Sequence, residues 1–81
     1  MQREELFLKK TIGNVLGIMP ESINNETSMD NVKEWDSLKH LNLVLAIEHA
    51  FDITLTEEQT IEIISFALIK VVLSEHGITF I

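Results

Sequence analysis

Apolar residues recur every three or four positions along much of this chain, and this spacing is typical of helices. The clearest run consists of Leu38, Leu41, Val44, Leu45, Ile47 and Phe51. An earlier run consists of Leu8, Ile12, Val15 and Leu16, and Gly17 follows it as a stop signal. Strand signals are weak, because the segment from Ile53 to Leu55 is too short. The sequence therefore predicts an all-α fold.

Residues that cap helices mark where three of the expected helices begin. Asp36 is suited to cap the helix that holds the clearest apolar run. Thr56 and Gln59 have the spacing of a capping box. Ser65 precedes a last apolar run, which Gly77 ends. These signals predict a small four-helix bundle with three longer helices and one short third helix. The expected helices are about Gln2 to Leu16, Ser37 to Phe51 or Asp52, Glu57 to Ile63, and Phe66 to Glu75.

Residues 17 to 35 are expected to form a long ordered loop between the first two helices. The segment contains the only proline, Pro20, together with many Ser, Thr, Asn and Asp residues that favour turns. A loop of this length is uncommon in a compact domain unless apolar residues anchor it. The expected anchors are Ile18, Ile23, Met29, Val32 and Trp35.

The length and composition of the chain limit its class. Its 81 residues are enough for one small core, so we expect a single domain, residues 1–81. The chain has no cysteine, so packing alone must hold the fold, and a thiolate metal site is excluded. We recognise no export signal after Met1, and the longest apolar stretch, residues 63 to 73, is about half the length of a membrane span. These features predict a cytoplasmic protein without a membrane span.

The charge of the chain indicates which partners to expect. The formal net charge is -7, from 13 acidic and 6 basic residues. Every base except Lys70 precedes residue 40, whereas the segment from Glu48 to Glu62 is acidic and has no base. Such a surface repels nucleic acid phosphates and attracts basic protein partners. The alternative is a solvated acidic face that serves solubility alone.

Ser37 is the residue whose setting says most about function, because it falls in the first turn of an expected helix. A serine nucleophile needs a base and a group that orients this base. His40 is the nearby candidate, but we expect it to point outward without an orienting acid, and no two histidines have the four-residue spacing of a helical zinc site. The N-terminus of a helix suits a phosphodiester on Ser37 better, because backbone N–H groups and the helix dipole stabilise an anion there. The alternative is an ordinary first-turn serine.

These residues resemble the acyl carrier protein family, whose pattern is Asp-Ser-Leu at the start of helix two, an apolar helix, Phe-Asp or Phe-Gly, and an acidic third helix. Here the pattern reads Asp36-Ser37-Leu38, then Phe51-Asp52 and Glu57-Glu58. Lys9-Lys10, Ile12-Gly13 and Leu16-Gly17 are similar to that family's first helix, so the resemblance covers essentially the full length. It implies that Ser37 carries 4'-phosphopantetheine, which a separate phosphopantetheinyl transferase adds from coenzyme A. The arm would hold acyl groups as thioesters, and the chain itself would not be an enzyme.

The resemblance implies roles for further residues. Asp36 would help the transferase to engage Ser37, and Leu38 completes the attachment motif. Acyl-loading and acyl-using enzymes with basic surfaces would dock on Leu38, Leu41, Leu45, Glu48, Asp52, Glu57 and Glu58. In that family the bundle interior can shelter an acyl chain, a role implied here for Leu43, Ala46, Ile47, Phe51 and Ile63. The alternative for this last set is plain core packing.

Three positions depart from the family's fatty-acid-synthesis members. Lys39 and Asn42 stand where those members usually have acids, and Trp35 stands where they usually have a small residue. A docking surface with fewer acidic residues favours a dedicated partner, because specificity can be set by removing a contact or by adding a repulsive charge. We therefore expect a freestanding carrier of a specialised pathway. For Trp35 the alternative is a loop anchor packed on the core.

The last expected helix is apolar on two faces. Phe66, Ile69, Val72 and Leu73 are expected to face inward, which leaves Leu68 and Val71 on the opposite face. We expect the C-terminal tail, with Ile78, Phe80 and Ile81, to fold back over Leu68 and Val71. The alternative is that this face forms a homodimer or binds a partner.

Two other functions remain open at the level of sequence. A carrier of aminoacyl or peptidyl units would have the same fold, because the cargo is attached to the arm and not to the chain. A helical adaptor without a prosthetic group is the alternative from another class. In that case Asp36-Ser37-Leu38 would only begin a helix, and the apolar face of the last helix would be the working surface.

Overall fold

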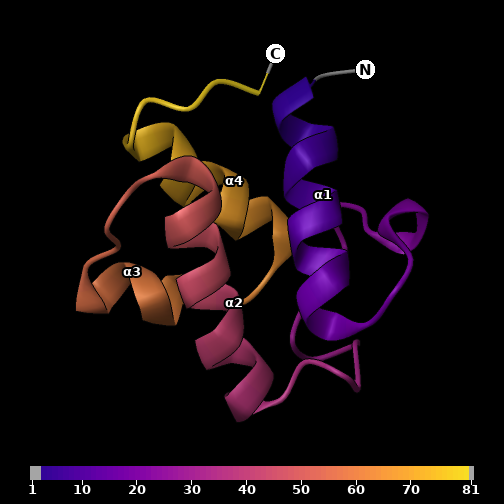
Figure 1. Ribbon diagram of the computed structural model, residues 1–81. Helices are drawn as coiled ribbons and strands as arrows, with labels where there is room; N and C mark the ends of the chain where they lie inside the picture. The colour runs from indigo at the N-terminus through magenta and orange to yellow at the C-terminus, as the bar shows by residue number, and fades with distance from the viewer. Residues whose placement is uncertain (1–2, 81) are drawn as a thin grey trace.

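The computed structural model describes residues 3–80 and consists of four α-helices and a short 3₁₀ helix (Figure 1). In chain order these are α1 (Arg3–Leu16), η1 (Pro20–Ser22), α2 (Ser37–Phe51), α3 (Glu57–Glu62) and α4 (Phe66–Glu75). The predicted all-α four-helix bundle is confirmed. Helix α3 ends one residue earlier than expected, because Ile63 leaves the helical conformation with a ψ of 57°. Gln2, the expected start of the first helix, lies outside the described residues.

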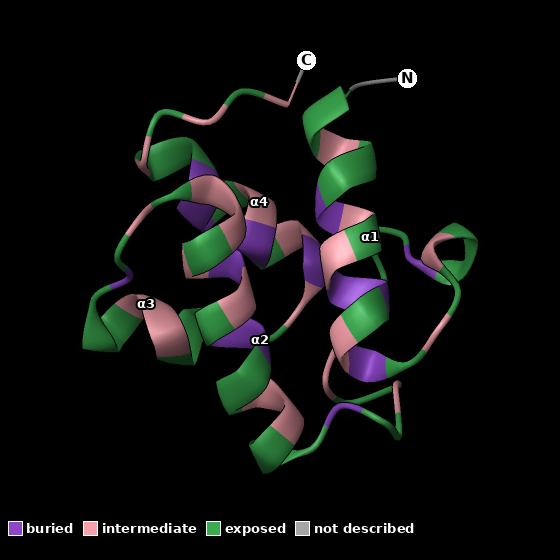
Figure 2. Cartoon of the chain, in the orientation of Figure 1, coloured by how far each residue is buried: buried purple, intermediate pink, exposed green. Residues whose placement is uncertain are grey.

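The core lies where α1, α2 and α4 face one another, as the buried positions in Figure 2 show. Burial of these apolar side chains supplies the main stabilising free energy of the fold. The helices contribute Leu8, Ile12 and Leu16 from α1, Leu43, Val44 and Ile47 from α2, and Phe66, Ile69, Val72 and Leu73 from α4. The connecting segments add Ile23, Trp35, Leu55 and Ile63. The inward-facing set predicted for α4 is confirmed, whereas α3 contributes no buried residue.

The three predicted helix caps are present. The carboxylate of Asp36 accepts a hydrogen bond from the N–H of Lys39 at 2.8 Å. Thr56 and Gln59 form the complete capping box at α3, and the hydroxyl of Ser65 caps α4. A cap of this kind typically stabilises a helix by about 1 kcal/mol. The caps therefore account for where these helices begin.

The long loop after α1 is anchored on the core as predicted. Ile23 and Trp35 are buried, and Ile18, Met29 and Val32 pack against the core with part of their surface exposed. Trp35 is thus a loop anchor, with 2% of its surface exposed.

Two close approaches fix the path of this loop, and the sequence pattern predicted neither. Near η1 the loop passes so close to α1 that a Cβ atom on Gly13 would lie 2.7 Å from the carbonyl oxygen of Ile18. Farther on, Ser28 and Ser65 form an isolated antiparallel bridge, flanked by two backbone hydrogen bonds of 2.9 Å. The bridge ties the loop to the junction between α3 and α4.

The tail as far as Phe80 does not cover the outer face of α4, so that prediction is wrong for the described residues. Leu68 and Val71 remain 41% and 53% exposed. Gly77, with a φ of +87°, turns the chain after α4, and Ile78 and Phe80 pack against the core instead. Ile81 lies outside the described residues. An apolar face of α4 is therefore open among residues 3–80.

Candidate functional site

Ser37 is the first residue of α2, and its side chain is exposed. The cap residue Asp36 already binds two first-turn donors, because its carboxylate accepts the N–H of Lys39 and its carbonyl oxygen accepts the N–H of His40, both at 2.8 Å. The N–H groups of Ser37 and Leu38 point out of the helix end, as first-turn N–H groups do. An anion attached to Ser37 would lie at the positive end of the helix dipole, which is typically worth about 0.3–1 kcal/mol.

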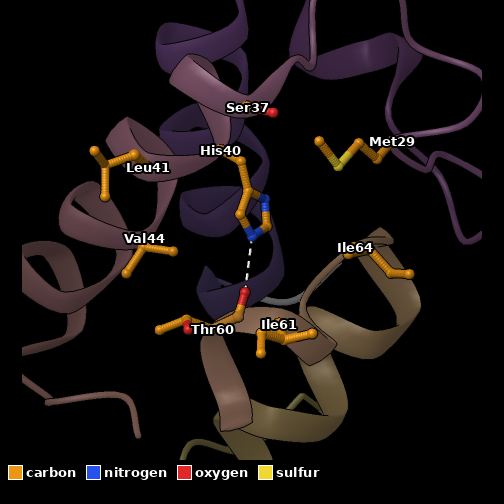
Figure 3. A pocket seen from close by; sticks show the side chains of 8 residues that line it. All are labelled: Met29, Ser37, His40, Leu41, Val44, Thr60, Ile61 and Ile64. Carbon is orange, nitrogen blue, oxygen red and sulfur yellow. Dashed lines mark hydrogen bonds between the residues drawn. The ribbon is translucent and has the colours of Figure 1, made fainter. Parts of the chain in front are cut away.

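A pocket of about 450 Å³ opens beside Ser37, between α2 and α3 (Figure 3). Most of its wall is apolar, and Figure 3 shows the Ser37 oxygen at one end of the space that the other side chains surround. Its lining residues are Met29 from the long loop, Ser37, His40, Leu41 and Val44 from α2, Thr60 and Ile61 from α3, and Ile64 from the link to α4. The volume lies in the range of small-molecule sites.

His40 does not point outward, so the prediction for this residue is wrong. Trp35 donates from Nε1 to His40 Nδ1 at 3.0 Å, and His40 Nε2 lies 2.7 Å from the carbonyl oxygen of Thr60 (Figure 3). An indole N–H only donates and a carbonyl only accepts, so Nδ1 is the acceptor and Nε2 carries the proton. This chain of hydrogen bonds joins the long loop, α2 and α3, because the buried Trp35 donates its indole N–H to Nδ1 of His40.

These hydrogen bonds also bear on whether Ser37 acts as a nucleophilic catalyst. A histidine that activates a serine must present a free basic nitrogen to the hydroxyl. Both ring nitrogens of His40 are already bonded, to Trp35 and to Thr60. The geometry therefore gives His40 a structural part at the pocket wall and does not make it a base for Ser37.

The residues that line the pocket differ from those expected to shelter an acyl chain. Leu43, Ile47 and Ile63 are at most 1% exposed in the core, and neither they nor Ala46 and Phe51 line the pocket. The sequence analysis did not predict the lining of this pocket, because it separated core residues from surface residues and did not consider those at the boundary between them. One signal was available, since positions 37, 40, 41 and 44 share one face of a helix that starts at Ser37.

The apolar residues expected to dock partners form an exposed stripe on α2. Leu38, Leu41 and Leu45 are 66%, 58% and 57% exposed. Their spacing of three and four residues places them on one side of the helix, and Leu41 also lines the pocket. The stripe therefore runs from Ser37 along the outer surface of α2.

The four acidic residues expected to dock partners lie in different settings. Glu57 and Glu58 are exposed in the first turn of α3, and Asp52 is exposed at the end of α2 with a φ of 54°. Glu48 is partly buried, and its Oε2 accepts the N–H of Leu55 at 2.8 Å. Part of the carboxylate of Glu48 is thus used to hold the turn between α2 and α3.

Lys39 was expected to add a positive charge to the partner-docking surface, but its side chain binds α1 instead. Its ammonium group donates to the carbonyl oxygen of Val15 at 3.3 Å. Val15 is in the last turn of α1, where carbonyl groups lack partners within the helix and a positive charge is favourable. Lys39 therefore links α2 to the C-terminal end of α1.

Metal-binding clusters and membrane-spanning helices are both absent from residues 3–80. No group of three or more His, Asp or Glu residues in this range is arranged to hold a metal ion. No helix within this range is long and apolar enough to cross a membrane.

Comparison with known proteins gives relatives that include two acyl carrier proteins. No family model matches the chain. It is 36% identical over 59 residues to the acyl carrier protein of Buchnera aphidicola subsp. Baizongia pistaciae, and the matched segment covers 73% of this chain and 76% of that protein. It is 38% identical over 58 residues to the acyl carrier protein of Buchnera aphidicola subsp. Schizaphis graminum, and the matched segment covers 72% of this chain and 73% of that protein.

Proposed function

Because this chain belongs to the acyl carrier protein family, we propose that it is a single carrier domain whose Ser37 receives 4'-phosphopantetheine from coenzyme A. A separate phosphopantetheinyl transferase would carry out the reaction. The Ser37 oxygen would lose its proton and form a phosphoester bond to the pantetheine-bearing phosphorus, while the pyrophosphate bond of coenzyme A breaks and adenosine 3',5'-bisphosphate leaves. The observation that supports this most is the place of Ser37, exposed at the start of α2 and on the rim of an apolar pocket.

The surroundings of Ser37 suit this group. The hydroxyl is open to a transferase, and the end of α2 offers N–H groups to the phosphodiester. Asp36 carries a negative charge next to the attachment point, but one of its carboxylate oxygens is bound by the N–H of Lys39. Asp36 thus orders the helix start that the transferase meets, and Leu38 offers an exposed apolar contact beside it.

The pocket beside Ser37 suits the cargo of a carrier. When bound, the arm supplies a thiol that holds an acyl group as a thioester. Leu41, Val44, Ile61 and Ile64 would contact an apolar part of the arm or cargo and keep water from it. The proposal therefore places the sheltered state of the cargo between α2 and α3, and not among the core residues Leu43, Ile47 and Ile63.

Enzymes that load or use the acyl group would dock on the stripe of Leu38, Leu41 and Leu45. The exposed acids Asp52, Glu57 and Glu58 would attract basic surfaces on these enzymes, with a smaller part for Glu48, whose carboxylate binds Leu55. Apolar contacts at the centre and charges at the rim are the usual distribution in such interfaces. We expect a dedicated partner of a specialised pathway, since Asn42 adds no acid to this surface and Lys39 binds α1. We expect the carrier to work in the cytoplasm.

The test is to incubate the purified chain with coenzyme A and a promiscuous phosphopantetheinyl transferase and to measure intact masses. We expect the parent chain to gain the mass of one phosphopantetheine group and the Ser37→Ala variant to gain none. Ser74→Ala is the matched control, because it removes another exposed helical serine hydroxyl and should leave the gain unchanged.

Two outcomes would contradict the proposal. A gain by Ser37→Ala would place the modification on another residue. No gain by any of the chains would favour the helical adaptor, in which the open face of α4 is the working surface.

A further inference from the structure

An open apolar groove lies between α3 and α4, and no residue of the α2 stripe lines it. It has a volume of about 380 Å³. Its lining residues are Ile61, Glu62, Ile64, Leu68, Val71, Val72 and Glu75. Ile61 and Ile64 are 73% and 43% exposed, and Leu68 and Val71 are open as well. Exposed apolar surface of this kind, rimmed by polar residues, marks interaction sites more often than isolated apolar residues do.

The described part of the chain does not fill this groove. The tail after α4 was the natural candidate, but Ile78 and Phe80 pack against the core instead. The occupant must therefore come from outside residues 3–80.

The charges at the groove have one sign. The charged residues that line it are Glu62, at the end of α3, and Glu75, at the end of α4. Lys70 faces another way, because its Nζ lies 3.3 Å from Glu5 Oε1 on α1 and 4.9 Å from the ring centroid of Phe66. Apolar walls with acids at the rim are complementary to an apolar segment flanked by Lys or Arg.

The same charges argue against a second copy of this chain. In a two-fold dimer each residue of the patch meets a residue of the same patch. Pairing of the groove with itself would bring Glu62 and Glu75 of both copies into one interface with no base among its lining residues, between molecules that each carry a net charge of -7. Like charges at such an interface oppose association.

We propose that the α3–α4 groove binds an amphipathic helix of a partner protein, with an apolar face and Lys or Arg flanks. A groove between two helices fits the recognition of a helix through apolar residues spaced three and four apart. No residue of the α2 stripe lines this groove, and its use goes beyond the proposed carrier function. Ile61 and Ile64 line both the groove and the Ser37 pocket, so the partner's helix would contact the outer side of the pocket wall.

The test uses the full chain carrying Ser37→Ala, so that binding does not depend on modification of Ser37. The probe is a synthetic helical peptide of about four turns, with leucines three and four residues apart and lysines on its flanks. One control peptide has glutamates in place of the lysines, and another has serines in place of the leucines. Binding is followed by the chemical shifts of backbone amides, and sedimentation is measured without peptide at rising concentration.

We expect the lysine peptide to shift amides around Ile61, Ile64, Leu68 and Val71, and both control peptides to bind at least about tenfold more weakly. The double variant Leu68→Ser/Val71→Ser should weaken binding about tenfold, whereas Leu38→Ser on the α2 stripe should leave it unchanged. An unchanged far-ultraviolet circular dichroism spectrum shows that each variant keeps its helices.

Three results would overturn the proposal. The first is no binding of the lysine peptide, and the second is a set of shifts confined to the α2 stripe. The third is self-association that the double variant abolishes, because a second copy would then occupy the groove.

Discussion

Helices α1 and α3 are held to the rest of the molecule by different means. Helix α1 is long and buries Leu8, Ile12 and Leu16 in the core, while the absent side chain of Gly13 lets the loop pass beside it. Helix α3 has six residues and none of them is buried. It is held by hydrogen bonds, including those from His40 to the Thr60 carbonyl and from Gln59 to Glu75.

Both of the proposed binding surfaces border α3, the α-helix without a buried residue. Residues of α3 line both the pocket beside Ser37 and the groove beside α4. Segments with little buried apolar surface open with a lower free energy than the core does. Helix α1 therefore contributes to global stability, and α3 is suited to adjust when a ligand or partner binds.

The largest expected effect is that of Ile12→Ala in α1. Ile12 is 1% exposed, and removal of a large aliphatic side chain from a core costs about 2–5 kcal/mol of unfolding free energy. The matched control is Ile61→Ala in α3, because Ile61 is 73% exposed and its loss should change stability by about 0.5 kcal/mol or less. Urea unfolding measures both, and equal losses would remove the contrast between the two helices.

A smaller effect is expected from His40→Phe, which keeps a planar ring but removes both hydrogen bonds of the imidazole. The N–H of the buried Trp35 would lose its acceptor, which costs about 1–3 kcal/mol. Release of the Thr60 carbonyl should also speed hydrogen exchange of the α3 amides. The control is His49→Phe on the exposed side of α2. If both variants show the same stability and the same exchange of α3 amides, the hydrogen bonds from Trp35 through His40 to α3 do not stabilise the fold.

The smallest expected effect is that of Thr56→Ala, which removes the cap of α3. A cap contributes about 1 kcal/mol, and we expect this loss as faster exchange of α3 amides with a smaller change in global unfolding. Ser65→Ala is the comparison, because it removes the cap of α4, whose four buried residues belong to the core. The loss of this cap should lower the free energy of global unfolding measured in urea. Equal changes in global stability would mean that α3 unfolds together with the core.

Much of the fold was predictable because it depends on short-range chemistry. The caps at Asp36, Thr56 and Ser65 act over three residues, so their positions in the sequence were enough to start the helices correctly. Apolar spacing likewise predicted the buried face of α4, and the anchors of the long loop followed from its length and composition.

The details of the candidate site were less predictable because they join distant parts of the chain. The carboxylate of Glu48 accepts the N–H of Leu55, and the ammonium group of Lys39 donates to the carbonyl oxygen of Val15, although the sequence suggested that both side chains were free charges. The outward prediction for His40 failed because it considered one helix alone, whereas Trp35 and Thr60 approach from the loop and from α3.

The sequence by itself determined the helices, the place of Ser37 at the start of α2 and the acidic character of the chain, since these follow from local spacing, capping and charge. Tertiary structure alone decided that a pocket opens beside Ser37, that His40 joins α2 to α3, and that the tail leaves Leu68 and Val71 exposed. The physical reason is that side chains compete for burial and for hydrogen-bond partners across the whole molecule. The outcome of that competition depends on which distant segments meet.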